Sequence, residues 1–390
     1  MPVRIAYAST YPPIHCGVGE YTRSLASALT ARPGVEVVVA AESGVGEPYV
    51  DKASGAMVKP SFTARDPSSY SGILDTLSSA GGVDVLHVQH EYGIFGAYRR
   101  LLEVVEEAKR EGLARKAVIT MHTVYHPMAG SVEAIEFQQS LLEAFDAIIV
   151  HLPIQSFELQ AQDVPVGIVH RIPHGTSVNP YVGVPKGLLA ERLGVPKRVL
   201  AGFTVVMMGF LRRDKGIDTL LEAVEEAGDS RPNVIVAGEP RDEELARTLR
   251  EYADRGLIEY IERYLSGDEM LMLAALADAI VLPYRDPPGK YAASGVLHQS
   301  MGSLKPVIGT GVPRLSELYQ LAPRLVFKPG DSDALARLLR WMSEPGNFDL
   351  AIAYASPIYS YAVRTSWPRM ARRHLEVYTA LLEGRRPSIA

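Results

Sequence analysis

The stretch TVVMMGFLRRDKGIDTLLEAV, from Thr204 to Val224, decides the fold of this chain. It opens with an apolar run typical of a buried strand, passes through Gly209 and a basic loop, and ends in apolar residues at helical spacing. A strand that leads directly into a helix is the repeating unit of a doubly wound parallel sheet. The rhythm continues through the second half of the chain, where the further strand-like runs are NVIVAGEP, AIVLPY, PVIGTG and RLVFKPG.

The first half of the chain shows the same alternation of apolar runs and amphipathic segments. At 390 residues the chain exceeds the roughly 250–300 residues at which one hydrophobic core usually stops growing, so two domains are expected. We predict an α/β fold with one Rossmann-like domain over residues 1–180 and another over residues 181–364, joined by a connection rich in Pro and Gly. The strand-like runs of the first half are RIAYAS, VEVVVAA, VDVLHVQH, KAVITMHT, DAIIVHL and VGIVHRIPH.

The last helix is expected within residues 365–390. It follows a segment, ASPIYSYAVRTS, that we expect to be broken. The helix SWPRMARRHLEVYTALLEG is long enough to return to the first domain and pack on it.

Charge and composition exclude several classes of protein. The net charge of −5 and the lack of a long Lys or Arg run predict no nucleic-acid partner. The single cysteine, Cys16, excludes an internal disulfide framework, and the N-terminal MPVRIAYAST has no signal-peptide pattern, so we expect a cytoplasmic protein. No window approaches the ~20 apolar residues of a membrane span, which leaves only peripheral membrane contact open.

Open parallel sheets bind ligands beyond the carboxyl ends of their strands, so the loops after the strands are the candidate sites. After RIAYAS, the chain enters a helix through Gly17 and Gly19. Glycines at a helix start let a ligand approach the backbone, whose N–H groups attract anions. A tight turn that needs positive φ explains these glycines equally well.

Polar side chains also follow two other strands of the first half. Gln89, His90 and Glu91 leave one buried strand in a row and are expected to face a cleft. A mutually hydrogen-bonded loop brace is the alternative. His122 ends the next strand, where a neutral imidazole would donate to a substrate hydroxyl or to a nearby carbonyl. A metal site is the weaker interpretation, because the histidines have no ligand spacing and no cysteine partners.

Two stretches of the second half are suited to an anion. Arg212, Arg213 and Lys215 end the loop after the strand at Thr204, where Arg gives forked hydrogen bonds to a diphosphate and Lys gives a point charge. In KYAASGVLHQSMGSLKPVIGTG, the N–H groups of Ser294, Gly295 and Val296 begin a predicted helix and have no acid among them to compete with an anion.

Taken together, these pieces resemble retaining glycosyltransferases of the GT-B fold, in particular glycosyltransferase family 4. The resemblance implies two Rossmann-like domains that face a central cleft, with the donor on the second domain and the acceptor mostly on the first. The motifs that carry it are RIAYASTYPP, CGVGEYTRSLASAL, HVQHEYGIFG, ITMHT, IPHG, GFLRRDKGIDTLLEAV, DAIVLPYRD, KPVIGTG and SWPRMARRHLEVY.

The resemblance assigns roles to several of these residues. Lys215 and either Arg212 or Arg213 would hold the donor diphosphate, since the family's usual arginine after the strand glycine is Phe210 here. Gly17 and Gly19 would line the diphosphate, and His122 would lie near the transferred sugar. We also expect donor contacts from Ser294, Gly295, Val296 and Gln299, and acceptor-side contacts from His90 and Glu91.

Two glutamates that the family usually carries are replaced. Counting back from KPVIGTG, their positions fall on Tyr291 and Gln299, and the Gln299 amide oxygen can still accept a bond from a ribose hydroxyl. A front-face retaining mechanism, proposed for such enzymes, lets the leaving phosphate take the acceptor's proton and needs no protein nucleophile. Sugar recognition is therefore the step that the replacements affect.

We predict a hexosyltransferase that uses a nucleotide sugar of the GDP-mannose or UDP-glucose type, a saccharide or lipid-linked acceptor, and no metal or other cofactor. The DSD sequence at Asp331 is expected to cap a helix rather than bind a metal. The main alternative is a catalytically silent subunit that binds nucleotide sugar, because both glutamates are replaced. An epimerase or a phosphorylase fits less well, since the acids near the sugar and any mark of a pyridoxal-phosphate lysine are missing.

Overall fold

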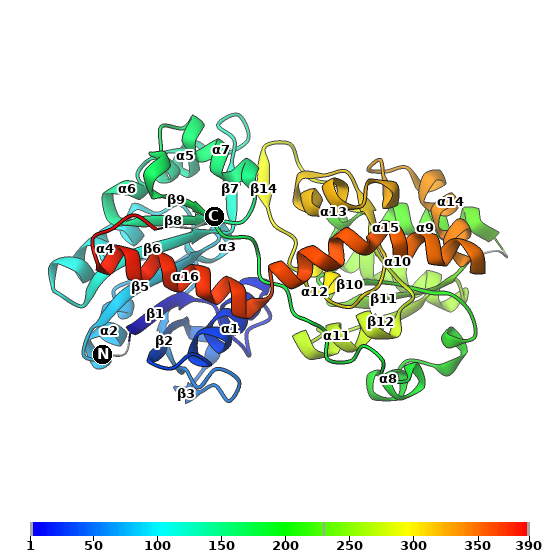
Figure 1. The fold of residues 1–390 in the computed structure, drawn as a ribbon, viewed down its shortest axis with the longest axis horizontal. Helices are drawn as coiled ribbons and strands as arrows, with labels where there is room; N and C mark the ends of the chain where they lie inside the picture. Colours follow the sequence, from blue (N-terminus) through cyan, green and yellow to red (C-terminus); the bar gives the residue numbers. More distant parts are fainter. Residues whose placement is uncertain (1–2, 229–230, 388–390) are drawn as a thin grey trace. The chain divides into compact units, whose positions relative to one another are not determined.

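The computed structural model describes residues 3–228 and 231–387, which form two compact units (Figure 1). The predicted bounds 1–180 and 365–390 reach the first two and last three residues, which lie outside the described part. The first unit comprises the described parts of Met1–Gly175, Pro288–Ala293 and Thr365–Ala390. The second comprises those of Thr176–Pro287 and Ser294–Arg364. The chain thus leaves the second unit at Pro288 and re-enters it at Ser294, a detour that the sequence did not predict.

The first unit is built on a sheet in the order β3-β4-β2-β1-β5-β6-β8-β9, parallel except for the β3–β4 pair. The order reverses between β1 and β5, which makes this the switch point where an open sheet binds ligands. The strands are β1 (Val3–Ser9), β2 (Val35–Glu42), β3 (Tyr49–Val50), β4 (Met57–Phe62), β5 (Val83–His90), β6 (Ala114–Met121), β8 (Ala147–Val150) and β9 (Val169–Arg171).

Alternate residues of each strand pack on opposite faces of this sheet. Ile5 and Tyr7 of β1 join one core with α1 and α16, which lie beside each other (Figure 1), whereas Ala6 and Ala8 join a second core with α2 and α4. Helices cover both faces, as the prediction of a doubly wound sheet requires. They are α1 (Gly17–Thr30), α2 (Gly72–Ser79), α3 (Tyr92–Phe95), α4 (Arg99–Arg110), α5 (Val132–Gln139), α6 (Leu141–Ala144), α7 (Pro153–Ala161) and α16 (Trp367–Leu382).

The second unit has a wholly parallel sheet in the order β12-β11-β10-β13-β15-β16. Its switch point lies between β10 and β13, so the loops after these two strands are neighbours. The two units confirm the α/β fold predicted from the sequence. The strands are β10 (Thr204–Met208), β11 (Asn233–Gly238), β12 (Glu259–Glu262), β13 (Ala279–Leu282), β15 (Val307–Thr310) and β16 (Val326–Phe327).

The helices of the second unit pack their apolar faces on this sheet to form one core. Asp331 caps α14 as predicted, because its carboxylate accepts a 2.8 Å hydrogen bond from the Ala334 N–H. The prediction of a broken segment before residue 365 is wrong, since α15 runs through Pro357. The helices are α8 (Lys186–Leu193), α9 (Ile217–Ala227), α10 (Glu243–Asp254), α11 (Gly267–Leu276), α12 (Gly295–Met301), α13 (Ser316–Leu321), α14 (Ser332–Ser343) and α15 (Pro345–Arg364).

The continuity of α15 has a packing explanation. The proline ring removes one N–H donor from the helix. Ala355, Ile358 and Ala362 nevertheless bury one face at helical spacing, and this burial outweighs the lost bond. Within the described residues, no helix has the length and apolar character needed to span a membrane.

Candidate donor and acceptor sites

The switch point of the second unit is shaped by two glycines. Gly209 follows β10 with φ of +105°, and a Cβ there would lie 3.0 Å from Cγ2 of Val296. Gly216 has φ of +67°, and a Cβ there would clash with the carbonyl oxygen of Pro283. Only glycine allows this approach, which holds the 3₁₀ turn Arg213–Lys215 against the chain that leaves β13.

Lys215 is a buried cation without an ionic partner. Its residue is 9% exposed, and Nζ lies 3.8 Å from the centre of the Tyr284 ring. Among the described residues, no carboxylate or hydrogen-bond acceptor contacts Nζ. Burial lowers the pKa of Lys215 well below its ordinary value, and the positive charges of Arg314 and Arg212 lower it further. A buried ammonium of this kind is suited to bind an anion.

Two acids and two arginines surround this lysine. Asp214 accepts 2.9 and 2.8 Å hydrogen bonds from Arg212 and another of 2.9 Å from Arg314. Asp286 binds Arg314 through Nε at 2.6 Å and through Nη2. Although burial opposes it, the two arginines lower the pKa of Asp214.

Arg213 lies apart from this group. Its side chain is 64% exposed and pairs with Asp242 at 2.8 Å and with Glu244. The Arg212 side chain is 49% exposed, and its bonds go to Asp214. The structure therefore brings Lys215 and Arg212 together and directs Arg213 toward the start of α10.

The predicted anion loop lies at the start of α12. The Ser294 hydroxyl is already used, because it accepts a 3.2 Å hydrogen bond from the Leu297 N–H. Gly295 and Val296 are half-buried in the first turn. Gln299 is also half-buried, and its amide makes no hydrogen bond to any described residue, so it is open to a ligand.

Tyr291, where the family usually carries an acid, belongs to the first unit. It lies in β14 (Lys290–Ala292), which pairs antiparallel with β7 (Thr123–Tyr125) and places Tyr291 opposite Val124. The Gln155 amide donates a 3.1 Å hydrogen bond to the Tyr291 carbonyl oxygen. Burial raises the pKa of the Tyr291 hydroxyl, and the neighbouring Glu158 carboxylate raises it further. The residue thus serves as part of a strand and faces Glu158.

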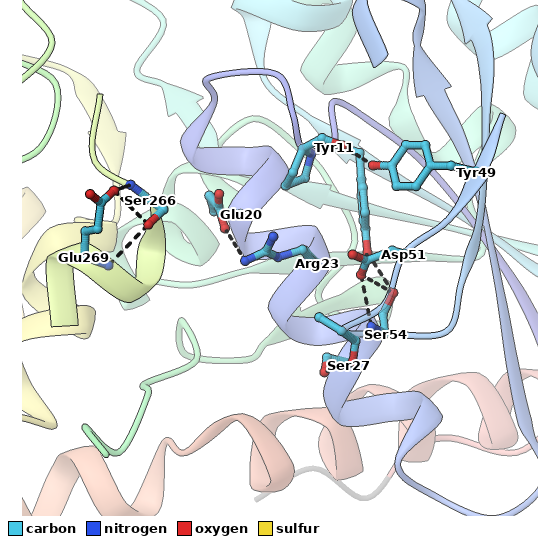
Figure 2. Close-up of polar contacts among 11 residues, drawn as sticks. Tyr11, Glu20, Arg23, Ser27, Tyr49, Asp51, Ser54, Ser266 and Glu269 are labelled. Carbon is cyan, nitrogen blue, oxygen red and sulfur yellow. Dashed lines mark hydrogen bonds and ion pairs between the residues drawn. The ribbon is translucent and has the colours of Figure 1, made fainter. Parts of the chain in front are cut away.

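In the first unit, the loop from β1 to α1 is held in place by polar contacts (Figure 2). The Tyr11 hydroxyl donates to Asp51 at 3.1 Å, and Asp51 also accepts a 2.6 Å bond from the Ser54 hydroxyl. The Tyr49 hydroxyl binds the Pro12 carbonyl oxygen. These bonds fix the loop that leads to Gly17.

The two glycines of this loop differ in their surroundings. A Cβ on Gly19 would lie 3.3 Å from the backbone of Thr10 and Tyr11, so a side chain there would press on the loop. A Cβ on Gly17 would meet no atom within 4 Å. Neither residue has positive φ, which argues against the turn explanation. Gly17 therefore leaves the backbone of α1 open to a ligand.

The polar residues at the ends of β5 and β6 form two groups. His122 Nε2 lies 2.9 Å from Gln89 Oε1, an arrangement in which the imidazole donates. Burial lowers the pKa of His122 well below its ordinary value, and His151 and His90 lower it further. His122 is therefore neutral at neutral pH, and because its Nε2–H is used by Gln89, its Nδ1 is left as a hydrogen-bond acceptor.

His90 is fully buried, in contrast to the expected cleft position. Its Nε2 lies 2.8 Å from the Gly96 carbonyl oxygen, and its ring stacks on Phe137 with centroids 4.7 Å apart. This is the loop-brace arrangement, and burial leaves the ring no surface for an acceptor. Glu91 is half-buried and accepts a 2.7 Å hydrogen bond from the Thr123 hydroxyl.

Comparison with known proteins identifies the class to which this site belongs. The family Glycosyltransferase Family 4 matches residues 16–179, and the family Glycosyl transferases group 1 matches residues 202–344. The chain thus carries a Glycosyltransferase Family 4 domain followed by a Glycosyl transferases group 1 domain. The first domain holds Gly17, Gly19 and His122, and the second holds the cationic group around Lys215.

Solved structures of glycosyltransferases share the GT-B fold of this chain. HepE from Anabaena, crystallised with UDP-glucose, has a TM-score of 0.74 at 16% identity over 97% of this chain and 99% of its own. Sucrose-phosphate synthase from Thermosynechococcus elongatus has a TM-score of 0.74 at 18% identity, over 98% and 100% of the two chains. The starch synthase IV catalytic domain from Arabidopsis thaliana, bound to ADP and acarbose, has a TM-score of 0.70 at 12% identity over 98% and 99%. No curated protein matches the sequence.

Sequence reasoning missed three residues of the second-domain site in this glycosyltransferase: Tyr284, Asp286 and Arg314. Each follows a predicted strand, in AIVLPYRD or in PVIGTGVPR, so the position after a strand was the available signal. Across residues 3–228 and 231–387, no three His, Cys, Asp or Glu side chains gather in a way that could hold a metal ion.

Proposed function

We propose that this protein is a retaining hexosyltransferase that moves a sugar from a nucleoside-diphosphate donor to a saccharide or lipid-linked acceptor, without a metal ion or other cofactor. The observation that carries the proposal is Lys215, a buried ammonium with no ionic partner in the described residues, at the switch point of a group 1 glycosyltransferase domain. A donor diphosphate supplies the negative charge that this position lacks. A cytoplasmic location, with peripheral contact to a membrane where the acceptor is a lipid, belongs to the same proposal.

The proposed reaction requires no nucleophile from the protein. The bond from the sugar's anomeric carbon to the diphosphate oxygen breaks, and the acceptor hydroxyl forms the new bond on the same face. The acceptor's proton passes to the departing diphosphate, so charge and atoms balance. Lys215 and Arg212 or Arg213 would stabilise the negative charge that develops on this leaving group.

The other predicted residues would position the two substrates. Gln299 has a free amide to accept a ribose hydroxyl bond, and Gly17 leaves backbone open to the diphosphate; Gly19, Ser294, Gly295 and Val296 would complete the donor contacts. His122 would bond the transferred sugar as a neutral imidazole. On the acceptor side, the half-buried Glu91 would contact the acceptor, whereas His90 would act by holding the loop that carries Glu91.

The donor is proposed to be of the UDP-glucose or GDP-mannose type. HepE was crystallised with UDP-glucose, which makes that nucleotide sugar the first to test. Since Tyr291 and Gln299 occupy the two positions where the family usually has glutamates, other groups than in most of the family must recognise the sugar. The acceptor is to be found by screening.

The test is release of nucleoside diphosphate from UDP-glucose, GDP-mannose and ADP-glucose with simple sugars as acceptors. Wild type is compared with Lys215→Ala and with Lys197→Ala, an exposed lysine of the same unit. The proposal is supported if wild type releases nucleoside diphosphate from one donor, Lys215→Ala releases it at least about 100-fold more slowly, and Lys197→Ala is unchanged. The loss is expected because Lys215→Ala removes a charged contact to the leaving group. If a donor raises the Tm of wild type but releases nothing, the protein is a silent nucleotide-sugar-binding subunit.

A further inference from the structure

Arg314 is a second buried cation beside Lys215. It lies on the connection that follows β15, and its side chain is 11% exposed. The centre of its guanidinium is 5.1 Å from the centre of the Tyr284 ring, the same ring that Lys215 approaches at 3.8 Å. Loops that follow three neighbouring strands of the sheet, β10, β13 and β15, thus place two cations against one aromatic ring.

The hydrogen bonds of Arg314 leave part of its guanidinium available. Of its five N–H donors, Nε and one hydrogen of Nη2 are used by Asp286, and one hydrogen of Nη1 is used by Asp214. One hydrogen remains on each Nη atom. All three hydrogens of Lys215 Nζ are also unused within the described residues. The two cations therefore have donors for several oxygens.

The charge balance around Tyr284 is also incomplete. When Lys215 is protonated, Lys215, Arg212 and Arg314 carry three positive charges, and Asp214 and Asp286 carry two negative charges. Both acids are already bound to arginine, and neither forms an ion pair with Lys215. Burying like charges together is costly unless a counter-charge is present, so the group lacks an anion.

The arginines nearer in sequence are less suited to supply the second cation. Arg213 is largely exposed and pairs with Asp242 and Glu244. Arg212 is half exposed, and its two bonded nitrogens both go to Asp214. Arg314, by contrast, is buried and shares the Tyr284 ring with Lys215.

We propose that Arg314 and Lys215 together bind the diphosphate, and that Arg212 holds Asp214 so that Arg314 keeps its position. This makes Arg314 a binding residue of the donor site, from a loop that no motif marked. Its assignment to a donor rests on the proposed function, whereas the anion site itself rests on the contacts around Tyr284.

Inorganic pyrophosphate tests the anion site without assuming a nucleobase or a sugar. Its affinity is measured by titration calorimetry for wild type, Arg314→Gln and Arg337→Gln, the last being a matched change of an arginine on α14 whose side chain is 60% exposed. Arg314→Gln should weaken binding about 10- to 100-fold, the range for a charged hydrogen bond, while Arg337→Gln stays within about 2-fold. Circular dichroism and Tm establish that each variant is folded.

Equal pyrophosphate affinities of Arg314→Gln and wild type would overturn the proposal and leave Arg314 as an ion pair of the fold. Absence of pyrophosphate binding to wild type at millimolar concentrations would overturn it as well. If Arg314→Gln does not fold, Arg314→Lys is used instead, because it keeps one positive charge near the two acids. A pyrophosphate affinity of Arg314→Lys equal to that of wild type would again count against the proposal. Failure of the proposed function gives a different result: the wild-type protein then releases no nucleoside diphosphate from any donor, whatever its affinity for pyrophosphate.

Discussion

The ammonium of Lys215 lies 3.8 Å from the centre of the Tyr284 ring, although the two residues come from the loops of different strands. The ring face attracts a cation, but it does not replace the hydrogen bonds that water gives an exposed ammonium. In the free protein, the protonation of Lys215 therefore depends on whether an anion lies at the switch point of the second sheet. Ligand binding there is expected to be coupled to protonation.

Nucleoside-diphosphate binding should take up a proton at Lys215. The pKa of Lys215 is lowered by burial and by Arg314 and Arg212, and a bound dianion favours the ammonium again. Between the lowered pKa and the ordinary value of 10.5, calorimetric titrations with UDP at one pH should give different apparent enthalpies in buffers of different protonation enthalpy. Affinity should fall as the pH rises through the pKa of the complex. Lys215→Met should remove the buffer dependence, and equal enthalpies for wild type in both buffers would contradict the coupling.

Gly17 and Gly216 should respond oppositely to alanine. The Cβ that Gly17→Ala adds would meet no atom within 4 Å and would lie at the start of a helix, so the free energy of unfolding should change by less than about 1 kcal/mol. Turnover of the donor should nevertheless fall. Gly216→Ala combines positive φ with a clash at Pro283 and should cost more than about 2 kcal/mol. Urea unfolding and the release assay measure both. Unchanged turnover in Gly17→Ala would show that no ligand approaches that backbone.

The first unit should lose stability as the pH falls from about 6.5 to 4. Burial lowers the pKa of both His90 and His374 to about 4. Because the unfolded chain binds protons at these sites near pH 6.5 and the native chain does not, the free energy of unfolding decreases on acidification, by about 3 kcal/mol per histidine once the pH is below 4. Urea unfolding at matched ionic strength from pH 7 to 4 measures this slope. His374→Phe should show a smaller slope than wild type, and identical slopes would exclude His374 as a source.

Tyr291→Phe should leave transfer within about 2-fold of wild type, because the hydroxyl neighbours Glu158 rather than a substrate site. Gln299→Ala should weaken donor affinity about 5- to 10-fold, the amount for a neutral hydrogen bond to ribose. Steady-state kinetics with the identified donor distinguish the two. A large loss in Tyr291→Phe would mean that this hydroxyl, despite its strand position, reaches the sugar.

The strand and helix pattern could be predicted because buried parallel strands and amphipathic helices leave direct marks in a sequence. The apolar run Thr204–Met208 and the helix Ile217–Ala227 both appear where the pattern predicted them. The segment that contains Pro357 was predicted to be broken but is helical, because the burial of one helix face depends on tertiary neighbours that the local sequence does not contain.

The site was predicted less completely for a related reason. Lys215 and Gln299 could be found from motifs, but Arg314 reaches the same ring only because β15 follows β13 in the sheet. Likewise, Gln89, His90 and Glu91 are consecutive, yet the alternation of side chains and the turn into α3 send them to three different environments. Strand order and side-chain direction decide such groupings.

The detour of Pro288–Ala293 has a practical consequence for engineering. Because β14 hydrogen-bonds to β7, a fragment cut after Gly175 would lose a strand of its own unit, and a fragment that starts at Thr176 would carry that strand with nothing to pair with. Exchanging donor halves between relatives must therefore keep Pro288–Ala293 matched to the recipient's β7. Chimeras joined at a single point should express poorly. Chimeras that transplant all three segments of the first unit together, Met1–Gly175, Pro288–Ala293 and Thr365–Ala390, should fold.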